Sequence, residues 1–123
     1  MTKKLAVVFS LLVAMVAFAG ETGVRPNGKL KKVDSKTVCM VNEMAMGKDQ
    51  IPVEVDGKTY YGCCAMCKES LVKNADKRVS TDPVTGKQVD KATAVIAAQE
   101  DGHVFYFESE ETLAKHNKLY DAQ

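Results

Sequence analysis

The sequence predicts a small α+β fold made of two tandem units, each a β-hairpin followed by a short helix. Two observations lead to this prediction. The segments VDGKTYYGCCAMCKESL (55–71) and EDGHVFYFESEETLAKH (100–116) align without a gap. Each contains an Asp-Gly hairpin turn signal and then a stretch of helical length and composition. One unit alone has too little core, so we expect the two units to pack their apolar faces together, with their sheets packed or joined edge to edge.

In the first unit, residues 51–55 alternate apolar and polar side chains, which is typical of a half-buried strand. Asp56-Gly57 predicts a tight turn, and residues 58–62 form the returning strand. Residues 65–74 then have the length and composition of a short helix. The second unit repeats this order, with strands expected over 92–99 and 103–107 and a helix from the N-cap Ser109 to about residue 119.

The cysteines occur in the first unit only. Upstream of the hairpins, TVCMVNEM (37–44) is set against PVTGKQV (83–89). Three cysteine positions then have these counterparts: Cys39 aligns with Thr85, Cys63 with Glu108 and Cys67 with Thr112. Because the scaffold repeats and the thiols do not, the pattern favours a local site over a packing role.

The N-terminus has the pattern of a secretory signal peptide. Lys3 and Lys4 precede Leu5–Phe18, an apolar run without a charge, and Ala17-Phe18-Ala19 offers small residues where a signal peptidase cleaves. The run is shorter than the roughly 20 residues that span a bilayer. We therefore expect residues 1–19 to be removed by a cut after Ala19, which implies a periplasmic or secreted protein with no stable membrane span after processing.

The processed chain is nearly neutral. The 17 basic residues include Lys3 and Lys4, so 15 remain against 16 acidic residues. Nucleic-acid binders usually carry a basic patch, so no nucleic-acid partner is expected. The predicted organisation of the chain is a signal peptide at 1–19, a flexible linker at 20–36, a metal-binding unit at 37–75 and a degenerate repeat unit at 81–120.

All sulfur atoms beyond the signal peptide lie within one short part of the chain. The cysteines are Cys39, Cys63, Cys64 and Cys67, and the methionines are Met40, Met44, Met46 and Met66. Thiolate and thioether are soft donors that suit Cu(I), and thiolate also suits Zn(II). Methionine also fills irregular gaps in cores, which is the alternative for each of these residues.

The spacing of the cysteines supports metal binding. If a helix begins at residues 63–64, Cys63 and Cys67 share a face, and so do Cys64 and Cys67. Cys39 comes from the loop before the hairpin, so that a strand end and a helix start face a loop in a clamp resembling a zinc knuckle. Thiols at a helix N-terminus have lowered pKa values, which favours the metal-binding thiolate.

Two alternatives to a metal site follow from the same residues. An exported protein can form disulfides, and Cys39 can pair with Cys63, Cys64 or Cys67. Cys64-Ala65-Met66-Cys67 is also formally a C-x-x-C redox motif, although such motifs normally follow a strand within a βαβ unit. There is no nucleophile–base pair, phosphate loop or carboxylate dyad, so an enzyme is not expected.

The first unit, VCMVNEM…GKTYYGCCAMCKESL, resembles the TRASH and YHS group of small metal-binding domains. Their pattern is a knuckle cysteine, an aromatic-rich strand and C-x3-C entering a helix, onto which Cys39, Cys63 and Cys67 fall. The second unit, DPVTGKQVD…HVFYFESEETLAKH, resembles the YHS form without its cysteines. The resemblance implies a treble-clef or zinc-knuckle-like fold and a role in heavy-metal sensing, trafficking or resistance, with copper prominent.

From these observations we expect an envelope protein that binds Cu(I), with Zn(II) as the alternative ion. Its partners would be the metal ion and a metal-donor or acceptor protein of the cell envelope. The expected thiolate ligands are Cys39, Cys63 and Cys67, with Cys64 as the fourth. The expected thioether donor is one of Met44, Met46 and Met66. The alternatives are a structural module stapled by zinc or a disulfide, and a thiol redox protein.

Overall fold

A computed structural model describes residues 25–121 of the chain. It is an α+β fold, as predicted, in which two helices accompany several small antiparallel strand pairs. The strands are β1 (Lys31–Val33), β2 (Val38–Cys39), β3 (Met44–Ala45), β4 (Ile51–Val55), β5 (Lys58–Gly62), β6 (Val79–Thr81), β7 (Gln88–Asp90), β8 (Val95–Ala98) and β9 (Val104–Phe107). The helices are α1 (Ala65–Lys73) and α2 (Glu110–Asp121), with short 3-10 turns at Ser35–Thr37 and Ala75–Arg78.

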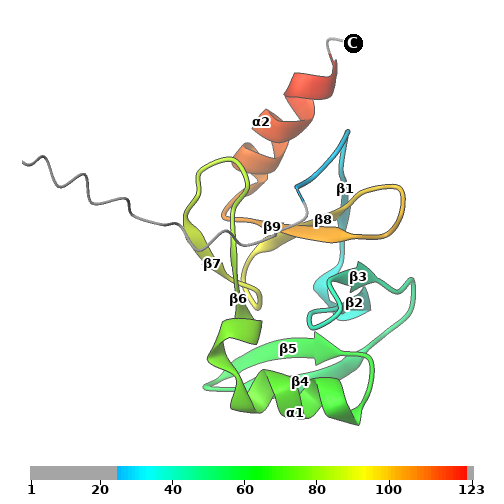
Figure 1. Ribbon diagram of the computed structural model, residues 1–123, viewed down its shortest axis with the longest axis vertical. Coiled ribbons are helices and arrows are strands. Elements are labelled where there is room, and N and C mark those ends of the chain that lie inside the picture. The colour runs from blue at the N-terminus through cyan, green and yellow to red at the C-terminus, as the bar shows by residue number, and fades with distance from the viewer. Residues whose placement is uncertain (1–24, 122–123) are drawn as a thin grey trace, which may run out of the picture.

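Each unit contains a small hairpin, a longer hairpin and a helix. The first unit has β2–β3, β4–β5 and α1, and the second has β6–β7, β8–β9 and α2. Figure 1 shows α1 with β4 and β5 at one end of the molecule and α2 at the other, with the remaining strands between them. The longer hairpins and both helices were predicted, whereas β1 and the two small hairpins, β2–β3 and β6–β7, were not.

The turn and cap signals in the sequence act as expected. Asp56 and Gly57 join β4 to β5 with φ of 52° and 76°, the left-handed pair that a tight hairpin turn needs. The backbone N–H of Thr112 donates to Ser109 Oγ at 3.3 Å, so Ser109 does cap α2. Arg78 Nη1 donates to the carbonyl of Leu71 at 2.7 Å, which satisfies a carbonyl near the end of α1.

The two units share a hydrophobic core. One cluster joins residues of both units: Val38, Met40, Val53, Tyr60, Leu71, Val89, Ile96, Val104 and Tyr106. A second cluster lies on the other face of β8–β9 and consists of Leu30, Ala97, Phe105, Phe107 and Leu113. All four residues of β9 are buried because successive side chains enter these two clusters alternately. The units therefore bury one common core, although β4–β5 and β8–β9 belong to separate sheets.

The structure corrects the predicted flexible linker over the residues of it that are described, 25–36. Leu30 is buried in the second cluster, and β1 adds a third strand to the β8–β9 sheet by pairing antiparallel with β8. The side chain of Asn117 on α2 accepts from the backbone N–H of Leu30 at 2.8 Å and donates to its carbonyl at 2.9 Å. The local composition of lysine, proline and glycine indicated a loop, but pairing with a distant strand overrides it. The predicted signal peptide lies outside the described residues.

Candidate metal centre

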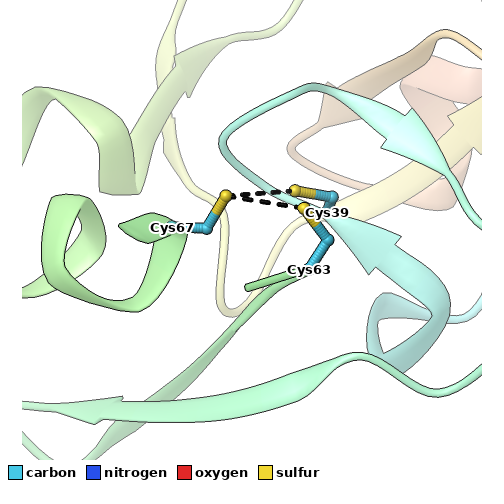
Figure 2. A group of neighbouring side chains, drawn as sticks. All are labelled: Cys39, Cys63 and Cys67. Carbon is cyan, nitrogen blue, oxygen red and sulfur yellow. Dashed lines mark hydrogen bonds between the residues drawn. The ribbon is translucent and has the colours of Figure 1, made fainter. Parts of the chain in front are cut away.

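The four cysteines lie where three short elements meet. Cys39 ends β2, Cys63 follows β5, Cys64 is the N-cap of α1, and Cys67 lies in the first turn of that helix. Figure 2 shows the side chains of Cys39, Cys63 and Cys67 pointing toward one another. The β2–β3 hairpin (residues 38–45), which we call the first knuckle, supplies Cys39 from a small hairpin where a loop was expected.

The spacing of three sulfur atoms suits a metal ion. The Sγ atoms of Cys39, Cys63 and Cys67 all lie within 4.8 Å of one another. The Sγ of Cys67 is 3.9 Å from that of Cys39 and 3.6 Å from that of Cys63. Thiolates placed tetrahedrally at about 2.3 Å from one zinc ion lie about 3.8 Å apart. The cysteines are free thiols, and these three, which we call the thiol corner, can hold one ion.

The other predicted sulfur ligands lie around this corner in different ways. The Sγ of Cys64 is 3.5 Å from that of Cys67, but Cys64 is exposed and is not one of the three mutually close thiols. Met66 is 78% exposed on α1, and Met46 is 40% exposed. The methyl group of Met44 lies toward Gly102 of the second unit. Roles for these methionines as thioether ligands remain predictions.

Met40 has a structural role at the site. Its backbone N–H donates to the carbonyl of Tyr61 at 2.9 Å, and the N–H of Tyr61 donates to Met40 Sδ at 3.4 Å. The residue is fully buried in the shared core. These bonds fix the first knuckle against β5, and so they hold Cys39 beside Cys63.

Three further residues support the thiol corner and carry no signal in the sequence. Asn42 Nδ2 donates to the Sγ of Cys63 at 3.4 Å. Glu43 adopts a left-handed φ of 59°, and its N–H donates to the carbonyl of Cys39 at 2.8 Å. Lys91, from the second unit, is buried, pairs with the Glu43 carboxylate and donates to the carbonyl of Met40 at 2.8 Å. Lys91 therefore joins the second unit to the first knuckle and stabilises the knuckle's conformation.

The thiols differ in their preference for the charged form. Burial raises the pKa of Cys39, but backbone N–H groups of Asn42 and Val41 outweigh burial and leave the pKa below its usual range. The backbone N–H of Cys67, at the start of α1, lowers the pKa of Cys64. Hydrogen bonding with Cys39 and Cys67 raises the pKa of Cys63 to about 12.

Burial also raises the pKa of Cys67. The lowered pKa expected for thiols at the helix N-terminus therefore applies to Cys64 but not to Cys63 or Cys67. The reason is that Cys63 hydrogen-bonds with neighbouring sulfurs and Cys67 is buried, whereas backbone N–H groups act on the sulfurs of Cys64 and Cys39.

The second unit has a corresponding corner in which oxygen atoms replace sulfur. The buried carboxylate of Asp82 accepts from the N–H groups of Val84 and Thr85 at 2.7 and 3.2 Å through Oδ1. Through Oδ2 it accepts from the N–H of Glu108 and from the hydroxyl of Thr112, both at 2.8 Å. We call Asp82, Glu108 and Thr112 the oxygen corner.

The structure corrects the predicted pairing of Cys39 with Thr85, because the counterpart of Cys39 is Asp82. In the first knuckle Cys39 pairs with Met44, five residues on, and in the β6–β7 hairpin the N–H of Asp82 bonds to Lys87, also five residues on. The fourth residue after each, Glu43 and Gly86, donates its N–H back to the carbonyl and has a left-handed φ.

The hydrogen bonds to the side chains agree with this correction. The N–H groups of residues two and three positions on act on the side chain of Cys39 and of Asp82 alike. By the same alignment Asn42 corresponds to Thr85. Asn42 contacts Cys63, and the Thr85 hydroxyl donates to the Glu108 carboxylate at 3.1 Å. The pairings of Cys63 with Glu108 and of Cys67 with Thr112 agree with the structure.

Comparison with known proteins adds no family assignment, because no protein-family model, curated protein or solved structure matches the chain. Among residues 25–121, neither helix has the length and apolar character needed to cross a membrane. The functional conclusion therefore depends on the geometry of the thiol corner.

Proposed function

We propose that this protein binds a soft metal ion, Cu(I), as its cargo through Cys39, Cys63 and Cys67. The observation that carries the proposal is the convergence of three Sγ atoms within 4.8 Å of one another. Cys63 and Cys67 are neighbours at the start of a helix, but Cys39 lies 28 positions from Cys67, so the fold and not the local sequence brings the third sulfur to the other two.

The choice of Cu(I) follows from the donor set and from exposure. Three thiolates are a soft set, and soft donors select Cu(I) over hard cations. Cys39 and Cys67 are buried, whereas Cys63 is half-buried, so the corner is closed on one side and open on the other. An open side suits an ion that must be taken up and released.

A structural zinc site is the second candidate, and one observation favours it. The Sγ of Cys64 lies 3.5 Å from that of Cys67, and a fourth thiolate would complete the closed tetrahedral set typical of structural zinc. In that case the metal would stabilise the fold, and the protein would act as an interaction module. A thiol redox role for Cys64 and Cys67 remains a third alternative.

The biological setting is part of the proposal. The signal-peptide pattern supports a periplasmic or secreted location, and the resemblance to TRASH and YHS domains supports metal trafficking, storage or resistance without enzymatic activity. The partner would be a protein of the cell envelope that donates or accepts the ion.

The test is to measure metal content, metal affinity and protected thiols together on residues 20–123 purified without oxygen. We expect one equivalent of Cu(I), with at least three of the four thiols protected from an alkylating reagent. Cys39→Ser should weaken Cu(I) binding by more than about 100-fold in competition with a chromophoric chelator, since losing even an outer-shell partner costs 10–100-fold.

Two outcomes would contradict the copper proposal. Tightly held zinc with four protected thiols would indicate the structural role. A metal-free protein with a reversible Cys64–Cys67 disulfide would indicate redox chemistry instead. Lys68→Ala serves as the control, because it changes an exposed side chain on the same helix without changing any candidate sulfur ligand.

A further inference from the structure

Cys67 occupies the centre of the sulfur cluster. Its Sγ has three sulfur neighbours, at 3.9 Å in Cys39, 3.6 Å in Cys63 and 3.5 Å in Cys64. Only Cys39 and Cys63 belong with Cys67 to the mutually close set. Cys64 is therefore not part of the thiol corner. It lies next to Cys67, however, and so it is within reach of an ion bound to that corner.

The four thiols also form a gradient of exposure. Cys39 is fully buried, Cys67 is 7% exposed, Cys63 is half-buried and Cys64 is exposed. The inner side of the gradient is closed by the buried Met40 and by Lys91. An incoming thiolate from another molecule therefore meets Cys64 first, and Cys39 is the thiol that it reaches last.

The oxygen corner provides an independent reference. The counterpart of Cys64 is Ser109, whose Oγ accepts from the N–H of Thr112 as the N-cap of α2. A serine or similar residue at the position of Cys64 would therefore serve the helix start by itself. A cysteine is not needed to cap the helix, and the thiol of Cys64 gives the site an exposed soft donor.

We propose that Cys64 is the exchange ligand through which the bound ion enters and leaves the thiol corner. The inference rests on the proposed function, since it requires a soft cargo ion. In the release step the Cys64 thiol gives up its proton and its sulfur bonds to Cu(I), while the bond from Cu(I) to Cys39 breaks and the freed Cys39 thiolate takes up a proton. The oxidation state and the number of sulfur ligands do not change.

After this step the ion is held by Cys63, Cys64 and Cys67, all at the strand-to-helix corner and nearer to solvent. The chemical class of the partner follows from the step. It is a molecule that presents a thiolate, which bonds to Cu(I) as one of the bonds to these cysteines breaks. Uptake is the same sequence in reverse.

The test compares equilibrium affinity with transfer rate in the Cu(I)-loaded protein. Cys64→Ser should keep Cu(I) affinity within about threefold of wild type, because it leaves the three resident ligands in place. Its rate of Cu(I) transfer to dithiothreitol in stopped-flow mixing should fall at least about tenfold, because it loses a donor held at high effective concentration. Lys68→Ala, an exposed change on the same helix that alters none of the candidate ligands, should change neither quantity.

The outcomes separate this inference from the proposed function. A loss of affinity in Cys64→Ser as large as that in Cys39→Ser would show that Cys64 is a resident fourth ligand and would overturn the exchange role. An unchanged transfer rate would also overturn it. If the wild-type protein itself failed to bind Cu(I), the proposed function would fall first, and the exchange role with it.

Discussion

The thiol corner and the oxygen corner are built on the same backbone and stabilised by different chemistry. In both, a small hairpin presents one side chain toward the end of a longer hairpin and the first turn of a helix. In the oxygen corner, Asp82 satisfies itself with four hydrogen bonds inside the protein. In the thiol corner, the three thiols lie close together but are only weak hydrogen-bond donors and acceptors for one another. Because hydrogen bonds alone satisfy the oxygen corner, this backbone arrangement does not depend on a metal, and a metal in the thiol corner can be cargo.

The largest effect is expected from converting one corner into the other. The triple variant Asp82→Cys, Glu108→Cys and Thr112→Cys should bind two equivalents of Cu(I) where the wild type binds one, because the shared backbone places the three new thiols as it places the original set. Stoichiometry is measured by Cu(I) titration, with circular dichroism to check folding. A double variant that keeps Asp82 is the control and should hold the second equivalent more weakly. A folded triple variant that binds one equivalent would show that the two corners do not share the same ligand geometry.

Without metal, replacing Asp82 should lower the free energy of unfolding more than replacing Cys39 at the equivalent position. Asp82→Asn should lower the free energy of unfolding by about 2–4 kcal/mol, because buried donors lose an acceptor. Cys39→Ser, at the equivalent position, should cost less in the metal-free protein. Urea denaturation of both variants at pH 7 tests this difference, and equal losses would contradict it.

The stability that Asp82 contributes should also depend on pH. Burial raises the pKa of Asp82, but hydrogen bonds from Glu108, Thr112, Val84 and Thr85 outweigh it and hold the pKa below its ordinary value of 3.8. A depressed folded-state pKa contributes stability that is complete above 3.8 and is lost as the pH falls through the folded value. The difference in stability between wild type and Asp82→Asn should therefore shrink below about pH 4. A difference that stays constant to pH 2 would contradict this account.

Gly62 in the first unit occupies the position of Phe107 in the second unit. Because Gly62 has no side chain, Cys67 can approach the backbone closely at this position. A Cβ added at Gly62 would lie 2.8 Å from the Cβ of Cys67. Gly62→Ala should destabilise the protein by about 1–3 kcal/mol through overpacking, and it should weaken Cu(I) binding by displacing Cys67. Thermal unfolding with and without Cu(I) measures both effects. Lys68→Ala, an exposed change on α1, is the control, and unchanged affinity in Gly62→Ala would exclude the close contact.

The smallest effects are expected from Asn42 and Thr85, each of which donates one hydrogen bond to a member of the thiol corner or the oxygen corner. Asn42→Ala removes one exposed donor to Cys63 and should weaken Cu(I) binding by up to about tenfold, the low end for an outer-shell partner. Thr85→Val removes the corresponding donor to Glu108 and should change stability by about 1 kcal/mol or less, with no change in Cu(I) affinity. A metal effect in Thr85→Val would show that the two corners are not independent.

Local signals in the sequence were sufficient for the elements that form from neighbouring residues. The turn at Asp56-Gly57, the strands on either side of it and the N-cap at Ser109 were all predicted, because each depends on φ/ψ preferences or hydrogen bonds within a few positions. The spacing of Cys63, Cys64 and Cys67 at a helix start was also predictable, because helical periodicity brings residues three and four apart together.

Distant contacts decided the rest. The pairing of β1 with β8 joins residues more than 60 positions apart, and the lysine-rich composition of β1 gave no sign of it. Asp82 was missed as the counterpart of Cys39 because the knuckle register depends on backbone pairing, whereas the residue identities favoured an alignment three positions away. Lys91 had no signal, since its partners at Met40 and Glu43 belong to the other unit.

The duplicated hairpin–helix plan, the confinement of thiols to one copy and the soft donor atoms of that copy could all be predicted from the amino-acid sequence. These properties follow from local periodicity and from the type of donor atom. Long-range packing is what brings the three sulfurs together, puts the Asp82 carboxylate in the matching place of the second copy and joins the two copies through Lys91. Those contacts arise because neither unit can bury its apolar face alone, and packing the two together sets distances that no segment of the chain encodes by itself.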